Sequence, residues 1–269
     1  MFVVAMVVSA QDPSAPSAPQ KYWPSAIWEW QENVITDATA QSAFFAFAAT
    51  HGIDRVYIEC ESAIQNNQPA LIGFLEAAAN NGLTTELLFG DARWVLPGSG
   101  YPHQGYAVSL VSIYTAQLLS QMTAGKPDAV HYDVEPYSLK QWKTEQNTIA
   151  LDYISLVTQL KAAAQPLGLR LSVDRYVIMD YWDTGPRIER QAMADLTYAD
   201  SVADTQVVIG VLSSCNQVPQ NTSFCNTTAH SGTAYMERAL GLVRKAVAVN
   251  AAFAGYAIED YAGFSILGP

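Results

Sequence analysis

Charged side chains are scarce in this sequence, and positively charged ones are the scarcest. Lys and Arg together supply 14 of the 269 residues and Asp and Glu supply 25, so the net charge is −11 and the pI is near 4.6. A chain this acidic repels nucleic acids and anionic membrane surfaces. We therefore expect no nucleic acid and no membrane as a partner, and a neutral or cationic substrate fits the charge better.

Several chemical signatures are also missing. No apolar run beyond the first residues approaches the ~20 that a membrane-spanning helix needs. The histidines and cysteines lack the CxxC, HxH and HExxH spacings of metal sites. There is no GxSxG nucleophile elbow, and the segment WEWQEN has no phosphate-binding glycines. The sequence therefore predicts neither a metal nor another cofactor, and it argues against a Ser-triad hydrolase.

The first residues differ in composition from the rest of the chain. An apolar run in residues 1–10 ends at Ser9-Ala10 and resembles a short signal peptide, although it lacks a basic start. Residues 11–24 are rich in Pro, Ser and Ala, which predicts a flexible linker. We expect a secreted protein in which residues 25–269 form a single barrel domain and act as a monomer.

The cysteine pattern agrees with secretion. Cys215 and Cys225 enclose the short polar loop CNQVPQNTSFC, which predicts a local disulfide. Two acceptor sites for N-glycosylation begin in and beside this loop, at Asn221 and Asn226. Cys60 ends an apolar run, so we expect a buried free thiol there.

Short apolar runs bounded by Gly, Pro, Asp or Asn alternate with helical patterns. The expected strands lie near 26–30, 55–60, 85–90, 129–133, 170–173, 177–181, 207–212 and 255–259. The clearest helical patterns cover 37–52, 69–82, 107–122, 148–168 and 231–250. This alternation predicts an α/β fold with a parallel sheet covered by helices. Eight strands favour a (β/α)8 TIM barrel, and a doubly wound open sheet is the alternative.

One region does not fit a complete barrel. In LRLSVDRYVIMDYWD, the fifth and sixth expected strands follow each other with no helix between them. A crossover between parallel neighbours needs a dozen or more residues. Either this run is one long strand, or a helix is missing and the barrel is incomplete around strands five and six.

The segment HYDVEPY places acidic residues at the end of an apolar strand. Residues two apart in a strand point the same way, so His131, Asp133 and Glu135 are expected to share one face. The active site of a barrel lies at the carboxyl ends of its strands. Two carboxylates there raise each other's pKa, which favours one protonated Glu beside one ionised Asp. That pair suits general acid catalysis on a glycosidic oxygen, and solvated carboxylates at a strand end are the plainer interpretation.

Acidic and aromatic residues gather at other expected strand ends as well. Aromatic faces stack on sugar rings, and carboxylates accept hydrogen bonds from sugar hydroxyls. The candidate substrate-binding residues are Trp28, Trp30, Glu59, Asp91, Arg93, Trp94, Tyr137, Asp180, Glu259 and Tyr261. For Trp28 and Trp30, filling the barrel interior is the competing interpretation.

Two of these segments carry a resemblance to a known family. DVEPY resembles the end of the D-x-D-x-E strand of family 18 glycoside hydrolases, the chitinase-like barrels, and MDYWD resembles their M-x-Y-D motif. The resemblance implies that Glu135 is the acid/base, and that Asp133 and Tyr181 contact a substrate N-acetyl group acting as nucleophile. The sequence departs from the pattern at His131, where the family has Asp, and at Trp182, where the second Asp is displaced to Asp183. The full set of motifs also resembles secreted barrel proteins without a stated activity.

The leading hypothesis is therefore a secreted glycoside hydrolase with Asp133 and Glu135 at its centre. Without an N-acetyl group in the substrate, a second carboxylate from Asp91, Asp180 or Glu259 would be needed. The separation of the two carboxylates then decides between retention, at about 5 Å, and inversion, at roughly 6.5–9.5 Å. The alternative is a carbohydrate-binding barrel without catalysis.

Overall fold

The structure is a computed structural model that describes residues 26–172, 175–179, 181–201, 206–215, 221–225 and 231–268. The expected signal peptide and linker, Asp180 and Asn226 lie outside these residues. The fold divides into two compact units. The first comprises the described residues within 1–30, 45–56 and 174–269, and the second comprises those within 31–44 and 57–173. The single barrel domain expected from the sequence stays a prediction.

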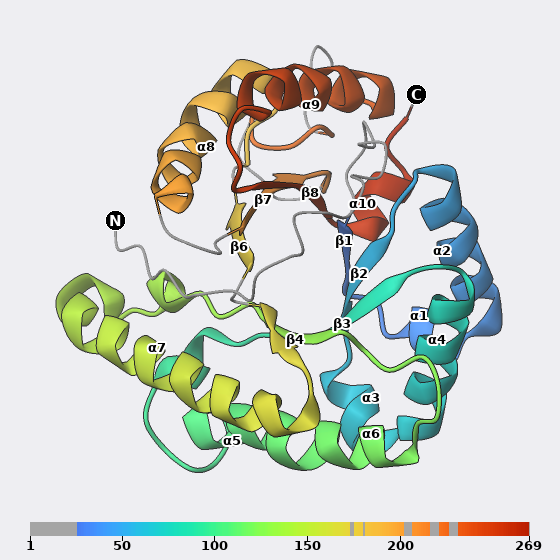
Figure 1. Ribbon diagram of the computed structural model, residues 1–269, viewed down its shortest axis with the longest axis vertical. Helices are drawn as coiled ribbons and strands as arrows, with labels where there is room; N and C mark the ends of the chain where they lie inside the picture. The colour runs from blue at the N-terminus through green and yellow to red at the C-terminus, as the bar shows by residue number, and fades with distance from the viewer. Residues whose placement is uncertain are drawn as a thin grey trace. The chain divides into compact units, whose positions relative to one another are not determined.

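The second unit contains strands in the order β2-β3-β4-β5, and β3, β4 and β5 run parallel (Figure 1). The strands are β2 (Arg55–Glu59, of which the last three residues belong here), β3 (Thr84–Phe89), β4 (Ala129–Tyr132) and β5 (Arg170–Leu171). Its longer helices are α4 (Gln68–Asn80) and α7 (Trp142–Ala164). Shorter helices are α1 (Asn33–Thr36), α3 (Glu61–Asn66), η1 (Ala92–Val95), η3 (Pro136–Ser138) and η4 (Gln165–Leu167). The helix expected over 107–122 consists of α5 (Gln104–Ser109), the π-helical turn η2 (Leu110–Thr115) and α6 (Ala116–Gln121).

The first unit contains the parallel strands β1, β8, β7 and β6 in that order (Figure 1). They are β1 (Ala26–Glu29), β6 (Arg175–Met179), β7 (Gln206–Leu212) and β8 (Phe253–Glu259). The helices are α8 (Gly185–Asp200), α9 (Thr233–Val247) and α10 (Tyr261–Ser265), and α2 (Ala38–Thr50) has residues in both units. The last strand therefore pairs with the first. Pairing of the first strand in the sequence with the last is the mark of a barrel, whereas a doubly wound sheet does not bring these two strands together.

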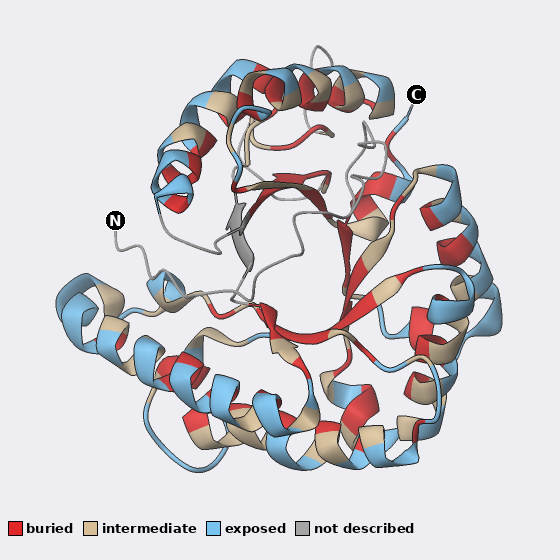
Figure 2. Cartoon of the chain, viewed as in Figure 1, coloured by how far each residue is buried: buried red, intermediate tan, exposed pale blue. Residues whose placement is uncertain are grey.

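All eight expected strands are present, and the fold is of the α/β, TIM-barrel-like class. Figure 2 shows that the described strands are largely buried, whereas the helices are buried along one side only. Apolar side chains recur in α8 with helical spacing, and its buried face includes Ile188, Ala192 and Leu196. This helix was missed in the sequence because charged and polar residues dominate it. Asp37 caps the start of α2, because its carboxylate accepts a hydrogen bond from the backbone N–H of Ala40 at 2.8 Å.

The irregular region holds two strands and not one long strand. β5 pairs with β4 and β6 pairs with β7, so the long-strand interpretation is wrong. Only residues 172–174 separate the two strands, which leaves no room for a helix. The expected loss of a helix at this point of the barrel therefore holds.

Candidate functional site

The two faces of the sheet in the second unit differ in character. On one face Tyr132 donates from its hydroxyl to the carbonyl of Ala107 in α5, at 2.7 Å, so this face meets the helices. The strand register places Leu88 opposite His131 and Ala129 opposite Arg170. Side chains alternate along strands, so the polar residues fall on the face away from the helices. They are Glu86, His131, Asp133 and Ser172.

Asp133 continues the strand ladder one residue past β4. Its backbone N–H donates to the carbonyl of Phe89 at 2.9 Å. Gly90 follows the last residue of β3. A Cβ built on it would lie 2.5 Å from the carbonyl oxygen of Asp133. A glycine is therefore needed for the backbone of Asp133 to approach this closely. The local sequence fixes where the first carboxylate of the pair stands.

Asp133 and Glu135 are electrostatically coupled. Burial raises the pKa of the Asp133 carboxyl, the charge of Glu135 raises it further, and His131 acts in the opposite direction. Glu135 is half-buried and accepts a short hydrogen bond from the hydroxyl of Tyr137. Asp133 is thus the group that retains a proton to a higher pH than an ordinary Asp. The sequence led us to expect the raised pKa at Glu135.

A buried polar layer lies on the same face, toward the start of the strands. Glu86 is 1% exposed and His131 is 6% exposed. The Nδ1 atom of His131 lies 2.9 Å from Ser172 Oγ and 3.5 Å from Glu86 Oε2. The imidazole also lies on the ring of Tyr57, with centroids 4.2 Å apart. His131 was expected on this face from the sequence, whereas Glu86 was not. The feature that could have revealed Glu86 is a carboxylate inside the otherwise apolar strand TTELLF.

A second acidic group follows β2. The Glu59 carboxylate accepts from the backbone N–H of Glu61 at 2.8 Å. Burial raises the pKa of Glu59, and the charge of Glu61 adds to the rise. Glu61 in turn accepts from the hydroxyl of Tyr106 at 2.6 Å. Glu61 and Tyr106 were not singled out from the sequence, because helix residues give no strand-end signal.

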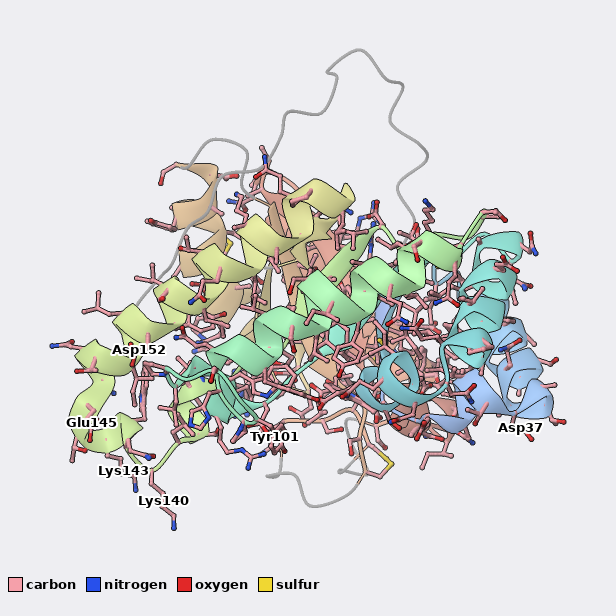
Figure 3. The ribbon with its side chains drawn as sticks, turned by 90° about the horizontal axis from the view of Figure 1, so that it is seen from below. Asp37, Tyr101, Lys140, Lys143, Glu145 and Asp152 are labelled. Carbon is pink, nitrogen blue, oxygen red and sulfur yellow. A yellow bond between two sulfur atoms is a disulfide. The ribbon has the colours of Figure 1, made fainter. Side chains whose placement is uncertain are left out.

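Arg93 and Asp91 form a surface ion pair after β3. The guanidinium donates to both carboxylate oxygens of Asp91, which holds the pKa of that carboxyl below its ordinary value. It also donates to the hydroxyl of Tyr101, the side chain labelled in Figure 3, at 2.8 Å and lies over that ring. Trp94 is fully buried against Tyr106. Its ring packs in the core, and substrate binding by Trp94 stays a prediction.

In the first unit, the ends of β1 and β8 hold the remaining candidates. Trp28 aligns with Glu259 in the register of the two strands, and the Tyr181 hydroxyl donates to Glu259 Oε2. Trp28 is only 3% exposed, which leaves little of its ring for a ligand. Trp30 is half-buried after β1. Burial raises the pKa of Tyr261, and the charge of Glu29 raises it further.

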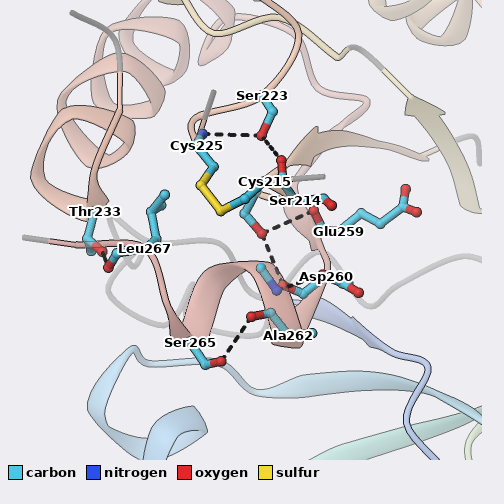
Figure 4. Close-up of a disulfide and its surroundings, with 12 residues drawn as sticks. Ser214, Cys215, Ser223, Cys225, Thr233, Glu259, Asp260, Ala262, Ser265 and Leu267 are labelled. Atoms are coloured by element: carbon cyan, nitrogen blue, oxygen red, sulfur yellow. Dashed lines mark hydrogen bonds between the residues drawn. A yellow bond between two sulfur atoms is a disulfide. The ribbon is translucent and has the colours of Figure 1, made fainter. Parts of the chain in front are cut away.

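The predicted disulfide joins Cys215 and Cys225, with Cα atoms 4.9 Å apart, and Cys60 is a buried free thiol. Figure 4 shows the bridge beside the end of β8. Ser213 donates from Oγ to the carbonyl oxygens of Glu259 and Asp260 at 3.1 and 3.0 Å. The disulfide thus begins two residues after Ser213, whose hydrogen bonds fix the backbone of Glu259. Asn221 lies in this loop, half-buried, and its glycosylation stays a prediction.

The described residues contain no group of three or more His, Cys, Asp or Glu arranged to hold a metal ion. Within the same residues, every helix is too short or too polar to span a bilayer.

Comparison with known proteins gives structural neighbours alone. No protein-family model and no curated protein matches the chain. A D-psicose 3-epimerase, crystallised in the presence of D-fructose, has 10% identity and a TM-score of 0.44, over 88% of this chain and 84% of that one. A monomeric beta-xylosidase from Caulobacter crescentus CB15 has 10% identity and a TM-score of 0.45, over 88% of this chain and 51% of that one. A GH39 beta-xylosidase from Caulobacter crescentus has 11% identity and a TM-score of 0.45, over 92% of this chain and 55% of that one.

This chain thus spans about half the length of the two xylosidase chains. All three neighbours are named as enzymes that act on sugars. With identities near a tenth and TM-scores below 0.5, these likenesses do not assign an activity to this chain.

Proposed function

We propose that the protein is a secreted glycoside hydrolase whose acid/base centre is the pair Asp133 and Glu135. The observation that carries the proposal is the position of both carboxyls at the carboxyl end of β4, where the backbone N–H of Asp133 is hydrogen-bonded to Phe89 and where burial, and then the charge of Glu135, raises the pKa of Asp133. In TIM barrels that end of the strands is where catalytic groups gather. Two carboxyls that share a proton supply both an acid and an ionised partner to one reacting bond.

In the proposed reaction Glu135 is the proton donor to the glycosidic oxygen. We assign this role to Glu135 because it follows the strand and its carboxylate accepts a hydrogen bond from the exposed Tyr137. Asp133 is the partner that acts in its ionised form while Glu135 gives up its proton. An ionised Asp133 stabilises the positive charge that develops on the sugar, and it orients an N-acetyl group if the substrate carries one.

The remaining candidates are proposed to bind the sugar. In the second unit Asp91, Arg93 and Glu59 offer charged hydrogen-bonding groups near the ends of β3 and β2. In the first unit Tyr181 and Glu259 already form a hydrogen-bonded pair that can exchange its bond for a substrate hydroxyl or amide. Trp30 and Tyr261 are the aromatic groups proposed for contact with a sugar ring.

A carbohydrate-binding protein without catalysis is the second candidate. The observation that favours it is β5, which has two residues and is followed almost directly by β6. A barrel that lacks a helix at this point has less structure to hold a site in place. Both candidates predict sugar binding, and only the first predicts turnover.

The test is a panel of polysaccharides and oligosaccharides that contains N-acetylated and non-acetylated members in matched pairs. Turnover of any member supports the hydrolase, and dependence on the acetyl group identifies a substrate-assisted reaction. Turnover without that dependence calls for a second carboxylate. Binding without turnover across the panel favours the sugar-binding protein, and neither binding nor turnover contradicts both.

A further inference from the structure

The buried pair of Glu86 and His131 has no task in the proposed reaction, and it is costly to maintain. Removing a carboxylate and an imidazole from water is unfavourable unless each finds a partner. Here Glu86 is 1% exposed, His131 is 6% exposed, and their side chains approach to 3.5 Å. A hydrophobic pair would fill the same space without that cost, which points to a role for the charge.

The contacts of His131 fix the direction in which its ring lies. Nδ1 faces Ser172 Oγ at 2.9 Å and Glu86 Oε2 at 3.5 Å, and one face of the ring lies on Tyr57. Three neighbouring strands thus hold one imidazole in a single orientation. The carboxylate of Glu86 gives a protonated imidazole its counter-charge.

His131 shares its face of β4 with Asp133, two residues further along. The ladder continues to Asp133 through its N–H bond to Phe89, so the alternation of side chains holds over this interval. A cation at position 131 therefore lies one step back along the strand face that carries the carboxyl of Asp133. The opposing action of His131 on the pKa of Asp133 agrees with this geometry.

We propose that His131, held by Glu86 and Ser172, is a positioning residue that places a positive charge beneath Asp133 and promotes its ionised form. The inference rests on the proposed function, because it assigns the ionised Asp133 a purpose. A carboxylate at position 131 would oppose ionisation of Asp133, and an imidazolium favours it.

Other titratable groups of the second unit must be considered beside His131. Those on β4 and its extension, on the neighbouring strands, or just after them are Tyr57, Glu59, Cys60, Glu61, Glu86, Asp91, Arg93, Tyr132, Glu135, Tyr137 and Arg170. Arg170 is paired with Asp128, and Asp91 is paired with Arg93. The positive charges of Arg93 and Arg170 thus lie in ion pairs with partly exposed side chains. The ring of His131 differs, because it is buried on the face that it shares with Asp133.

The test is a titration of the Asp133 side-chain carboxyl by carbon-13 NMR in the full chain. His131→Asn removes the cation and keeps an amide near the position of Nδ1. We expect it to raise the Asp133 midpoint by about 1 pH unit. Ser172→Ala keeps the cation and should leave the midpoint within a few tenths of a unit. Glu135→Gln removes the like charge and should lower the midpoint, so the two charge variants must shift it in opposite directions.

An unchanged or lowered midpoint in a folded His131→Asn protein overturns the proposal. If that variant does not fold, the wild-type protein supplies the decision through nitrogen-15 NMR of the His131 ring. The proposal requires an imidazolium while Asp133 titrates, and a neutral ring throughout that titration overturns it. Neither measurement needs turnover, so an inactive protein would refute the hydrolase and leave this result standing. In an active protein, the acid limb of the pH–rate profile should move upward with the Asp133 midpoint.

Discussion

Substituting Gly90 by alanine tests whether the close approach of β3 to β4 sets the position of Asp133. The new Cβ would lie 2.5 Å from the carbonyl oxygen of Asp133 and 3.4 Å from its Cβ. Ordinary contact begins near 3.4 Å, so the Asp133 carbonyl must move by about 0.9 Å or the strands must separate. Overpacking of this kind costs about 1–3 kcal/mol of unfolding free energy.

The same shift displaces one carboxyl of the proposed pair. A misplacement of about 1 Å lowers activity by roughly 100-fold where geometry is critical. Urea unfolding measures the stability, and the backbone and carboxyl NMR signals of Asp133 measure the displacement directly. Both readouts apply before a substrate is known.

Gly73→Ala is the matched control. Gly73 lies exposed in α4, and nothing comes within 4 Å of a Cβ built on it. This substitution should stabilise the protein slightly, by up to about 1 kcal/mol, because alanine suits a helix better than glycine. Wild-type stability and unshifted Asp133 signals in the Gly90→Ala protein would refute the reasoning.

Three further predictions concern stability. Replacing Cys215 and Cys225 together by serine should lower the free energy of unfolding by about 2.7 kcal/mol for this sequence separation of 10, and an unchanged urea midpoint would contradict it. Asp37→Ala should cost about 1 kcal/mol, because the N–H of Ala40 loses its cap, and equal stability of the two proteins would argue against the cap. Because the folded chain raises the pKa of Asp133 above 3.8, the stability that its protonated form contributes is present below pH 3.8 and is lost as the pH rises through the raised value. Asp133→Asn should therefore be more stable than wild type at pH 7 and lose that advantage in acid, which unfolding at several pH values will measure.

The positions of the strands could be predicted from the sequence because their apolar runs are short and sharply bounded. Runs such as RVYIE and QVVIGVL correspond to β2 and β7 with boundaries displaced by one residue or less. The pattern failed for α8, because polar and charged residues separate the few large apolar residues of its buried face. It also could not decide between one strand and two at β5 and β6. That choice depends on pairing with β4 and β7, which are distant in the sequence.

For the candidate site, the sequence indicated the type of residue and not its surroundings. The spacing of Asp133 and Glu135 predicted that the two act together, and their coupling agrees with it. Burial is the main cause of the raised pKa of Asp133, and the burial of a single side chain is not encoded in a local pattern. Trp94 is a second example. Tryptophan is a residue type that suits sugar binding, but the sequence does not indicate that this side chain is fully buried.

The most direct test of the central claim compares wild-type protein with Glu135→Gln on every glycan of the panel that either protein binds. The substitution keeps the shape of the side chain and removes the proton that the reaction needs. We predict that turnover falls by roughly 10²–10⁴-fold while the dissociation constant for the glycan changes little. Wild-type turnover in the Glu135→Gln protein would contradict the account, because the acid would then have to be another residue.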